Sequence, residues 1–309
     1  MKVMEQIYII GAGAVGKVLA VTLALNNRKV VLLRGSVDNQ GSYIENIQVT
    51  TAQHGVMEAN IEVSSLSNVP VLNGLVVLTN KSFGNAGLAQ ALKGKTGDSP
   101  IVLLQNGLGV EQVFIDHSFP QVYRCVLFMT SQVMAENKIS FKPVAVSPIG
   151  LIKGGDNQLN NIVAQLNCPQ FGFRTESNIQ PIIWKKAIAN SVFNSICPLL
   201  DIDNGIFCRD EGVMAMASRV IKECVGIAQA KGVAITEAEV TETVLMISRL
   251  SDGQLISTLQ DINHKRPTEI ETLNFAMVDI AQSLQLGYTV TETKLLGELT
   301  KWKSDLHRL

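Results

Sequence analysis

The sequence lacks an excess of charge of either sign. Its 309 residues contain 26 lysines and arginines against 27 aspartates and glutamates, which leaves a formal net charge of -1. Proteins that bind nucleic acids usually carry a basic surplus, because they neutralise phosphates. The balance therefore argues against a nucleic-acid partner, and we expect a small-molecule one.

Cysteine is scarce, and no two cysteines form a C-x-x-C pair. The five are odd in number and widely spaced, at Cys125, Cys168, Cys197, Cys208 and Cys224. Neither a disulfide framework nor a zinc site is suggested by such spacing. We expect reduced, mostly buried thiols in a cytoplasmic protein without a bound metal.

An uninterrupted apolar run of membrane length is also lacking. The segment "IYIIGAGAVGKVLAVTLAL" approaches the roughly 20 residues that a spanning helix needs. Lys17 and three glycines interrupt it, however. We therefore expect neither a signal sequence nor a membrane span.

The first half of the chain alternates short apolar runs with helix-compatible or loop stretches. The runs occupy residues 6–11, 29–34, 74–80 and 101–107. Near-continuous apolar strands of this kind are typical of a parallel sheet covered on both faces. Strand-like pieces follow between about residues 123 and 153, and they predict a hairpin near Glu136–Asn137 and an antiparallel extension of the sheet.

Helical patterns dominate after about residue 175. They lie near 178–200, 210–231, 235–250, 252–265, 268–286 and 290–306. Thr268 with Glu271 three residues later predicts a capping box at the start of the fifth of these helices. Because 309 residues exceed a comfortable single core, we predict an α/β Rossmann-type domain over residues 1–177 and an all-α domain over residues 178–309.

A glycine-rich turn follows the first predicted strand. The segment "GAGAVG" gives the spacing G-x-G-x-x-G at the start of a helix, which suits a tight turn, close approach of a pyrophosphate and helix–strand packing. We assign dinucleotide binding to its residues Gly11, Ala12, Gly13, Ala14, Val15 and Gly16.

The residue at the end of the second predicted strand indicates whether the dinucleotide carries a 2′-phosphate. An acidic residue at this place would hold the ribose 2′-hydroxyl of NAD, but this chain has Arg34. A guanidinium suits a 2′-phosphate, which a carboxylate would repel. We predict NADPH over NADH; in the alternative, Arg34 is a solvated strand-end residue and Asp38 reaches the ribose.

Two further strand ends carry polar residues. Lys81 follows the run at 74–80, and Asn106 lies directly before Gly107, the last residue of the run at 101–107. Ligands of open α/β sheets lie beyond the carboxyl ends of the strands. Lys81 could pair with a phosphate or a substrate carboxylate, or be an exposed loop lysine. Asn106 could face a nicotinamide or simply form a turn with Gly107.

A line of polar residues marks the predicted helix at 178–200. Lys186, Asn190 and Asn194 are spaced four apart among apolar neighbours, so successive members are offset by only about 40° around the helix. A buried lysine needs partners to keep its charge. Asn204 beyond the helix, the pair Ser257 and Asp261, and Glu269 provide further polar groups for a groove.

The chain resembles the ketopantoate reductases, which belong with the 6-phosphogluconate-dehydrogenase-like reductases. The resemblance rests on "GAGAVG", the strand-end arginine, "NK" at 80–81, "QNGLG" at 105–109, "WKKAIANSVFNS" at 184–195, "DNG" at 203–205 and "STLQDINHKRPTEIETLN" at 257–274. These motifs run in the family's order over nearly the whole chain. Gln254 and Phe275 depart from the pattern of some members.

The resemblance implies roles for individual residues. Lys186 corresponds to the family's catalytic lysine and Glu269 to its catalytic-site glutamate. The substrate-binding positions fall on Asn106, Asn190, Asn194, Asn204 and Ser257, while Lys81 and Asn106 lie next to the cofactor. The implied fold is a Rossmann domain followed by a helical domain, with the substrate between them.

The implied reaction is reduction of ketopantoate to pantoate by NADPH, with Lys186 as the general acid. A histidine is the rival acid, but His54, His117 and His307 lie outside the polar groove and His264 ends a charged helix. Alternatives are a reductase of another 2-oxo acid or an opine-type imine, and a non-catalytic NADP(H) sensor. An apolar helical domain is compatible with a homodimer.

Overall fold

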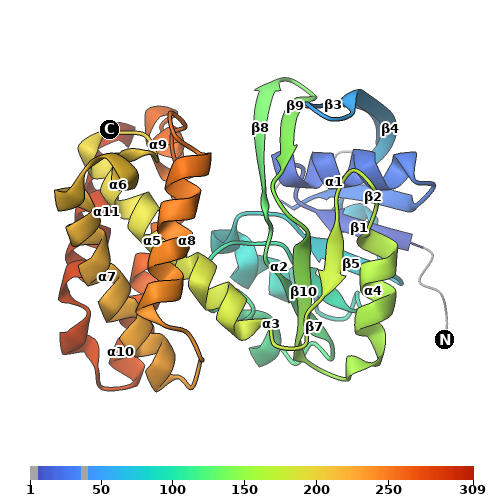
Figure 1. Ribbon diagram of the computed structural model, residues 1–309. Helices are drawn as coiled ribbons and strands as arrows, with labels where there is room; N and C mark the ends of the chain where they lie inside the picture. The colour runs from blue at the N-terminus through green and yellow to red at the C-terminus, as the bar shows by residue number, and fades with distance from the viewer. Residues whose placement is uncertain (1–5, 36–40) are drawn as a thin grey trace. The chain divides into compact units, whose positions relative to one another are not determined.

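The computed structural model describes residues 6–35 and 41–309, and the chain divides into two compact units. Unit 1 consists of the residues up to Gln105 together with Val110–Ile179, and unit 2 of Asn106–Gly109 together with Gln180–Leu309. Figure 1 labels their elements. The short loop Asn106–Gly109 thus belongs to the helical unit, although it follows a strand of the sheet in sequence.

A parallel sheet forms the centre of unit 1. Its strands are β1 (Gln6–Ile10), β2 (Lys29–Arg34), β5 (Leu75–Leu78), β6 (Ile101–Leu103) and β7 (Val122–Cys125). They lie in the order β7-β6-β5-β1-β2, and every neighbouring pair is parallel. Chain order reverses around β1, which is where open α/β sheets place their ligands.

Helices cover both faces of this sheet, as the continuous apolar strands predict. On one face, α1 (Ala14–Leu25) and α4 (Leu159–Leu166) share a core with alternate strand residues such as Ile9 and Leu32. On the other face, α2 (Asn85–Leu92) and α3 (Gln112–Asp116) pack on Ile10 and Leu33. The fold is therefore three-layered.

Two strands were not predicted from apolar runs in the sequence, namely β3 (Tyr43–Thr51) and β4 (Gly55–Ser65). These form an antiparallel hairpin, and β4 continues the sheet parallel to β2. In β3 buried residues such as Ile47 and Val49 alternate with more exposed ones. Half-buried strands show a period of two rather than an apolar run.

The predicted antiparallel extension occurs at both edges of the sheet. The first part of the strand-like region that begins near residue 123 forms two strands, β7 and β8 (Met129–Ala135), which lie in different parts of the sheet order. β10 (Ser147–Lys153) pairs antiparallel with β7 and is followed in the order by β11 (Phe173–Thr175). β9 (Lys138–Pro143) forms the predicted hairpin with β8, and Asn137 takes a positive φ of 55° in its turn.

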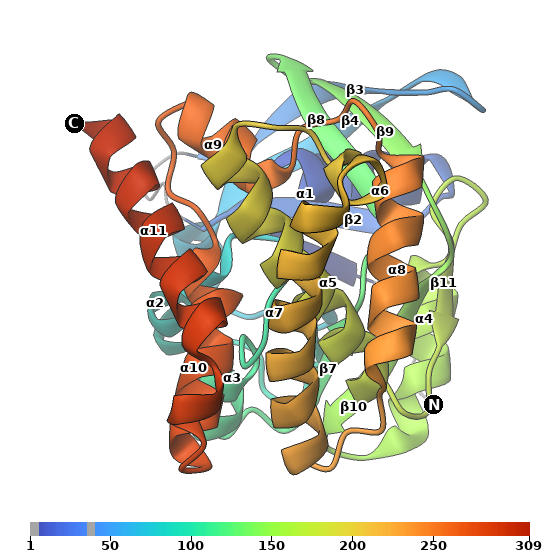
Figure 2. The ribbon, with the colours of Figure 1, turned by 60° about the vertical axis from the view of Figure 1, so that its left-hand side comes forward.

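Unit 2 is helical apart from its loops. Its helices are α5 (Gln180–Leu200), α6 (Ile206–Arg209), α7 (Glu211–Ala230), α8 (Glu237–Leu250), α9 (Ser257–Asn263), α10 (Asn274–Ser283) and α11 (Thr291–Arg308). α5 contacts α7, α8, α9 and α11. Figure 2 shows the ribbon of these helices from a second direction. This central place explains why α5 is apolar on most of its circumference.

Short 3₁₀ turns complete both units, at Leu66–Asn68, Ser82–Gly84, Asp156–Gln158, Ile270–Thr272 and Gly287–Thr289. The capping box predicted at Thr268 is wrong. Glu271 instead pairs with Lys301 at 2.9 Å, and α10 begins only at Asn274, after Leu273 leaves the helical region with ψ of -94°. A capping box occurs at Thr236 and Glu239, at the start of α8.

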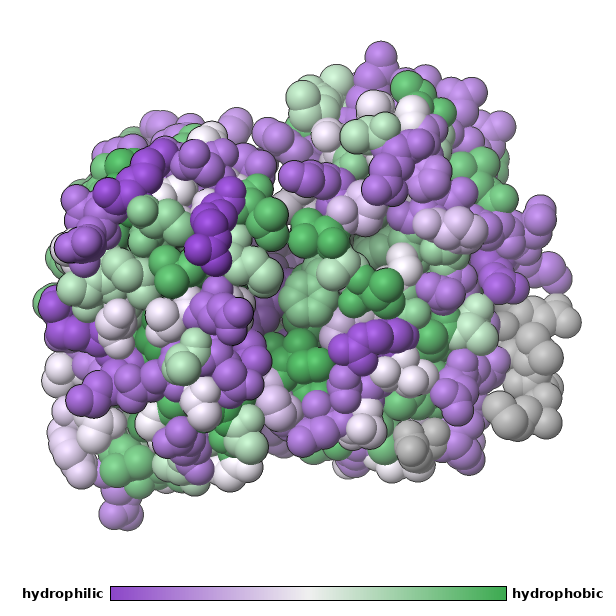
Figure 3. All heavy atoms as spheres, in the orientation of Figure 1, coloured by the Kyte–Doolittle hydropathy of each residue, from purple (hydrophilic) through white to green (hydrophobic). Residues whose placement is uncertain are grey.

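No helix in residues 6–35 and 41–309 has the length and apolarity needed to cross a membrane. Figure 3 shows hydrophilic and hydrophobic side chains interspersed over the visible face of each unit. Such mixing is usual, because polar atoms alone do not cover a folded protein.

Candidate functional site

The glycine turn of unit 1 has the shape that a pyrophosphate requires. Gly11 has φ of 119°, and a Cβ there would lie 2.5 Å from the backbone nitrogen of Asn80. At Gly16 a Cβ would lie 1.9 Å from the Gly11 carbonyl oxygen, whereas at Gly13 it would meet nothing within 4 Å. The first and third glycines thus allow close packing, and the second leaves open space in front of the turn.

The start of α1 offers donors to this open space. Gly13 is the N-cap and makes no side-chain capping bond, while Ala14 and Val15 are the first helical residues. No acidic side chain lies in the first turn. Unpaired N–H groups and the helix dipole favour an anion here, so the turn fits a dinucleotide phosphate.

Arg34 ends β2 on the face of the sheet that α1 covers. Its guanidinium carbon lies 4.9 Å from the centroid of the Tyr43 ring, which packs on the apolar core beneath α1. The cation and the ring are separated in the sheet by β4, where Ser65 is the register partner of Arg34. Ser36 and Asp38, which follow Arg34, lie outside the described residues.

Buried amides organise the carboxyl ends of β5 and β6. The side chains of Asn85 and Gln105 exchange two hydrogen bonds of 2.8 Å, and Gln105 also donates to the Asn80 carbonyl oxygen at 2.9 Å. The Arg124 guanidinium donates to the Gln105 carbonyl oxygen and pairs with Glu111. Lys81, predicted to lie near a cofactor, is exposed directly after Asn80.

This amide network is not among the sites predicted from the sequence. The only available signal was the presence of amides after two neighbouring strands, in "NKSFGN" and "QNG". Since Gln105 directly precedes Asn106, the network fixes the point from which the next loop leaves the sheet.

The loop with Asn106 is built into unit 2. Leu108 donates its N–H to the Thr272 carbonyl oxygen at 3.0 Å, and Thr272 donates its own N–H to the Glu269 carbonyl oxygen at 3.1 Å. A Cβ on Gly107 would lie 2.5 Å from the Thr272 carbonyl oxygen. The backbone of Glu269 is therefore linked through Thr272 to Leu108, in the loop that contains Asn106.

The predicted polar line lies along α5. Lys186 and Asn190 are partly exposed, whereas Asn194 is 3% exposed. The Oδ1 of Asn194 accepts the Ser257 hydroxyl at 3.1 Å and the Thr258 backbone N–H at 3.2 Å, and its Nδ2 donates to the Asn190 carbonyl oxygen. The line on α5 is thereby joined to the N-terminus of α9.

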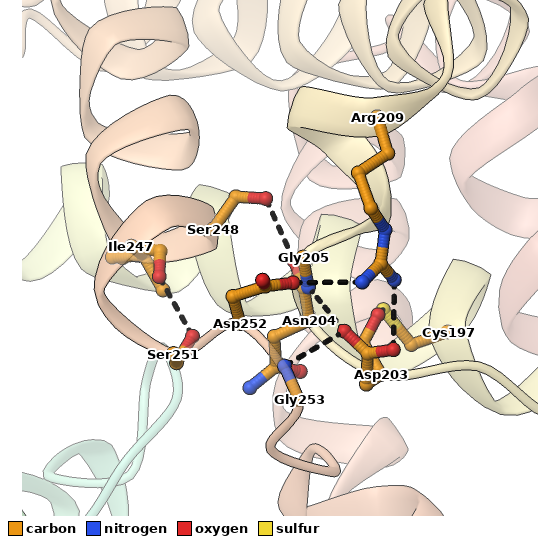
Figure 4. Close-up of polar contacts among 10 residues, drawn as sticks. All are labelled: Cys197, Asp203, Asn204, Gly205, Arg209, Ile247, Ser248, Ser251, Asp252 and Gly253. Carbon is orange, nitrogen blue, oxygen red and sulfur yellow. Dashed lines mark hydrogen bonds and ion pairs between the residues drawn. The ribbon is translucent and has the colours of Figure 1, made fainter.

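Asn204, the remaining predicted substrate residue, lies in the loop after α5. It is 6% exposed; its N–H donates to the Gln254 carbonyl oxygen at 2.9 Å and its carbonyl oxygen accepts the Ser248 hydroxyl at 2.8 Å. Its Oδ1 is buried and has no hydrogen-bond partner among the described residues. Figure 4 shows Asn204 between Asp203 and Gly205.

An arginine forms ion pairs with two aspartates next to Asn204. Arg209 donates to Asp203 Oδ2 and to Asp252 Oδ1, both at 2.7 Å, as Figure 4 shows. The Arg209 guanidinium lowers the pKa of the Asp203 carboxyl to about 2, aided by N–H groups of Gly205 and Gly253. The sequence motif "DNG" suggested Asn204 but not these ion pairs.

Metal-ligand clusters, histidines and cysteines are the other candidates for chemistry. In the part of the chain that the structure describes, no cluster of His, Cys, Asp or Glu could hold a metal ion. His117, His264 and His307 each direct Nδ1 to the carbonyl oxygen four residues earlier in their own segments. Burial raises the pKa of both the Cys197 and the Cys224 thiol to about 12, so these thiols stay protonated.

Two family models match the chain. "Ketopantoate reductase PanE/ApbA" matches residues 7–147, and "Ketopantoate reductase PanE/ApbA C terminal" matches residues 178–299. Together with the three-layered fold of unit 1, the glycine turn and the helical unit, these matches define an oxidoreductase built from a Rossmann-type domain and a helical domain. The chain belongs to the ketopantoate reductase family.

Known proteins resemble the chain over nearly its full length. The 2-dehydropantoate 2-reductase of Streptococcus pyogenes serotype M3 is 28% identical over 305 residues, which cover 96% of this chain and 97% of the relative. The solved structure of dimeric ketopantoate reductase from Staphylococcus aureus has a TM-score of 0.81 at 20% identity, covering 98% and 99% of the two chains. D-mandelate dehydrogenase with NADH and anilino(oxo)acetate has a TM-score of 0.84 at 20% identity, covering 98% and 100%.

Proposed function

We propose that the protein reduces the C2 carbonyl of 2-dehydropantoate to pantoate with NADPH, on the route to pantothenate and coenzyme A. Family membership and the similarity to the Streptococcus pyogenes reductase support this substrate. The observation that carries the proposal is the bonding of Ser257 and Thr258 to Asn194. These bonds place the Ser257 hydroxyl against the Asn194 amide. Asn194 lies one turn after Asn190 on α5, the helix that also carries Lys186.

Unit 1 would bind the NADPH. Gly11, Ala12, Gly13, Ala14, Val15 and Gly16 would hold its pyrophosphate at the open N-terminus of α1, and Arg34 its 2′-phosphate. Lys81 and Asn106 would contact it nearer the nicotinamide. When bound, it would supply the hydride that reduces the carbonyl carbon.

Lys186 would donate a proton to the oxygen of the reduced carbonyl. An ammonium stabilises the negative charge that develops there. Glu269 would hold this ammonium in its charged form. Because the Glu269 backbone accepts from Thr272, the glutamate starts from a fixed turn.

The amides would orient the substrate. The Oδ1 of Asn194 accepts two protein donors and one N–H of its Nδ2 bonds the Asn190 carbonyl oxygen, so its second amide N–H is what it would offer a substrate hydroxyl, together with Asn190 and Asn204. The Thr258 N–H identifies Oδ1 as the acceptor, which makes Ser257 a donor in this arrangement. To hold the substrate carboxylate, Ser257 would turn its hydroxyl hydrogen from Asn194 to the ligand.

The test replaces Lys186 with methionine, which keeps the length of the side chain but removes its charge. Lys186→Met should lower kcat with 2-dehydropantoate by about 10²–10⁴-fold, the usual contribution of a positioned acid. Lys185→Met is the matched control, because Lys185 pairs with Glu239 at 3.1 Å. Near-normal turnover of Lys186→Met, followed at 340 nm, would refute the assignment.

A second candidate is reduction of a different 2-oxo acid. The structural likeness to D-mandelate dehydrogenase with NADH favours keeping it. A panel of 2-oxo acids and imines, each with NADPH and NADH, separates the two candidates by kcat/KM. Absence of turnover with every compound would instead support a non-catalytic NADP(H) sensor.

A homodimer is the proposed assembly. The Staphylococcus aureus relative is dimeric, and α11 exposes Leu295, Leu299, Trp302 and Leu306 at spacings of four, three and four residues. Such residues lie on one side of a helix and suit a second copy of the same surface. Light scattering coupled to size exclusion should give twice the chain mass, and Trp302→Glu should shift it toward the monomer.

A further inference from the structure

We propose that Arg209 is a positioning residue that fixes Asn204 and Ser257 for binding of the 2-oxo acid. The ion pairs of Arg209 with Asp203 and Asp252, here called the Arg209 clamp, join the loop after α5 to the loop before α9. The inference rests on the proposed function for its kinetic consequences, but the geometry of the clamp can be tested separately.

The Arg209 clamp joins two loops that are far apart in sequence. The Arg209 guanidinium bonds Asp203 in the first loop and Asp252 in the second, at 2.7 Å each. The other oxygen of Asp203 accepts the N–H of Gly205 at 2.8 Å and that of Gly253 at 3.1 Å. Asp203 therefore binds the backbones of both loops while it holds the arginine (Figure 4).

Asn204 depends on this arrangement for its position. Its backbone is tied to Gln254 and Ser248, and its Oδ1 has no hydrogen-bond partner among the described residues. Because no described residue holds the Oδ1 of Asn204 by a hydrogen bond, the position of its side-chain amide depends on the position of its backbone. Moving the loop between Asp203 and Gly205 would therefore move the amide.

The position of Ser257 depends on the loop before α9. The residues from Asp252 to Gln254 lead into α9, whose first residue is Ser257. Ser257 must reach Asn194 for the bond of 3.1 Å that joins α9 to α5. Release of Asp252 would loosen the segment directly before this contact.

Arginine is the residue type that this geometry requires. The planar guanidinium presents several N–H groups and can bond two carboxylates at once, whereas a lysine acts as a point charge. Arg209 and Asp252 are exposed, at 44% and 60% of their side-chain surfaces, so the ion pair between them contributes little to stability. Their proposed importance is for position rather than for folding.

The kinetic test compares Arg209→Met with Arg219→Met. Arg219 is a matched control, because it bonds both oxygens of Glu292 at 2.7 Å in the same unit and its side chain is 57% exposed. Arg209→Met should raise KM for 2-dehydropantoate roughly tenfold and leave kcat and KM for NADPH nearly unchanged, the pattern expected when binding is lost equally in the ground state and the transition state. Arg209→Lys should recover part of this loss, and Arg219→Met should show none of it.

A second measurement follows the two loops without substrate. Hydrogen exchange in residues 201–206 and 251–257 should be faster in Arg209→Met than in the wild type or in Arg219→Met. Unchanged exchange in Arg209→Met, or an equal effect of both substitutions on KM, would overturn the positioning role. If the wild type fails to reduce 2-dehydropantoate, the proposed function fails, while the exchange result still decides whether Arg209 holds the loops.

Discussion

The guanidinium carbon of Arg34 lies 4.9 Å from the centre of the Tyr43 ring, within cation–π range. Arg34 ends β2, and Tyr43 begins β3 on the far side of β4. The ring covers one face of this guanidinium, whereas a guanidinium bonds a phosphate through the N–H groups at its edge. The ring thus restrains the side chain that we propose for the 2′-phosphate.

Substitutions at both residues should weaken NADPH binding. We expect Arg34→Ala to raise Kd for NADPH by tenfold or more and to leave Kd for NADH nearly unchanged, because about 1.5–3 kcal/mol of charge-assisted bonding is lost. Tyr43→Leu should cause a smaller loss, whereas Tyr43→Phe, which keeps the ring, should cause little. Calorimetric titration with NADPH, NADH and 2′,5′-ADP measures each effect. Retained NADPH preference in Arg34→Ala would show that the arginine does not select the cofactor.

The Asn106 loop yields a second prediction, because Gly107 is confined by Thr272. Gly107→Ala would place a Cβ 2.5 Å from the Thr272 carbonyl oxygen at φ of 95°. We expect a loss of about 1–3 kcal/mol of stability and a lower kcat/KM. Gly109→Ala is the control, since Gly109 also has positive φ (67°) but its Cβ would meet nothing within 4 Å. If Gly107→Ala and Gly109→Ala lower the free energy of unfolding in urea equally, the positive φ rather than contact with Thr272 is the reason that Gly107 must be glycine.

Local patterns were sufficient to predict the glycine turn and the central helix. The turn at Gly11–Gly16 follows from residue types within one strand–helix unit, and the line from Lys186 to Asn194 follows from helical periodicity. The resemblance to ketopantoate reductases, carried by several motifs in order, correctly indicated the family that the two family models match. The residue roles implied by that resemblance stay predictions.

Tertiary contacts explain what the sequence patterns did not predict. The hairpin of β3 and β4 is half-buried, so it has no apolar run, and its burial is set by α1 and the neighbouring strands. Glu271 has the spacing of a capping box with Thr268, but Lys301 from α11 binds it. Arg209 and Asp252 are separated by 43 residues, and no local period brings such residues together.

Reactivity of the thiols provides a third prediction. Cys208 is exposed, whereas Cys125, Cys168, Cys197 and Cys224 are buried. Burial raises the pKa of the Cys168, Cys197 and Cys224 thiols, which lowers their thiolate fractions further. Titration of the native protein with a thiol reagent should therefore give one fast-reacting group, which Cys208→Ala removes. Fast reaction of two or more thiols at neutral pH would contradict the buried positions.

Acid should weaken the Arg209 clamp through Asp203, which is the fourth prediction. The Arg209 guanidinium lowers the pKa of this carboxyl from 3.8 to about 2. A group with a lowered pKa in the folded state stabilises the protein above its unfolded pKa, and this contribution is lost as the pH falls toward the folded value. We therefore compare unfolding free energies of the wild type and Asp203→Asn between pH 2 and pH 7. The difference should be constant above about pH 5, shrink below pH 4 and be smallest near pH 2, because protonation makes Asp203 as neutral as asparagine. A difference that keeps its full size at pH 2 would mean that Asp203 stabilises the fold by shape and neutral hydrogen bonds rather than by its charge.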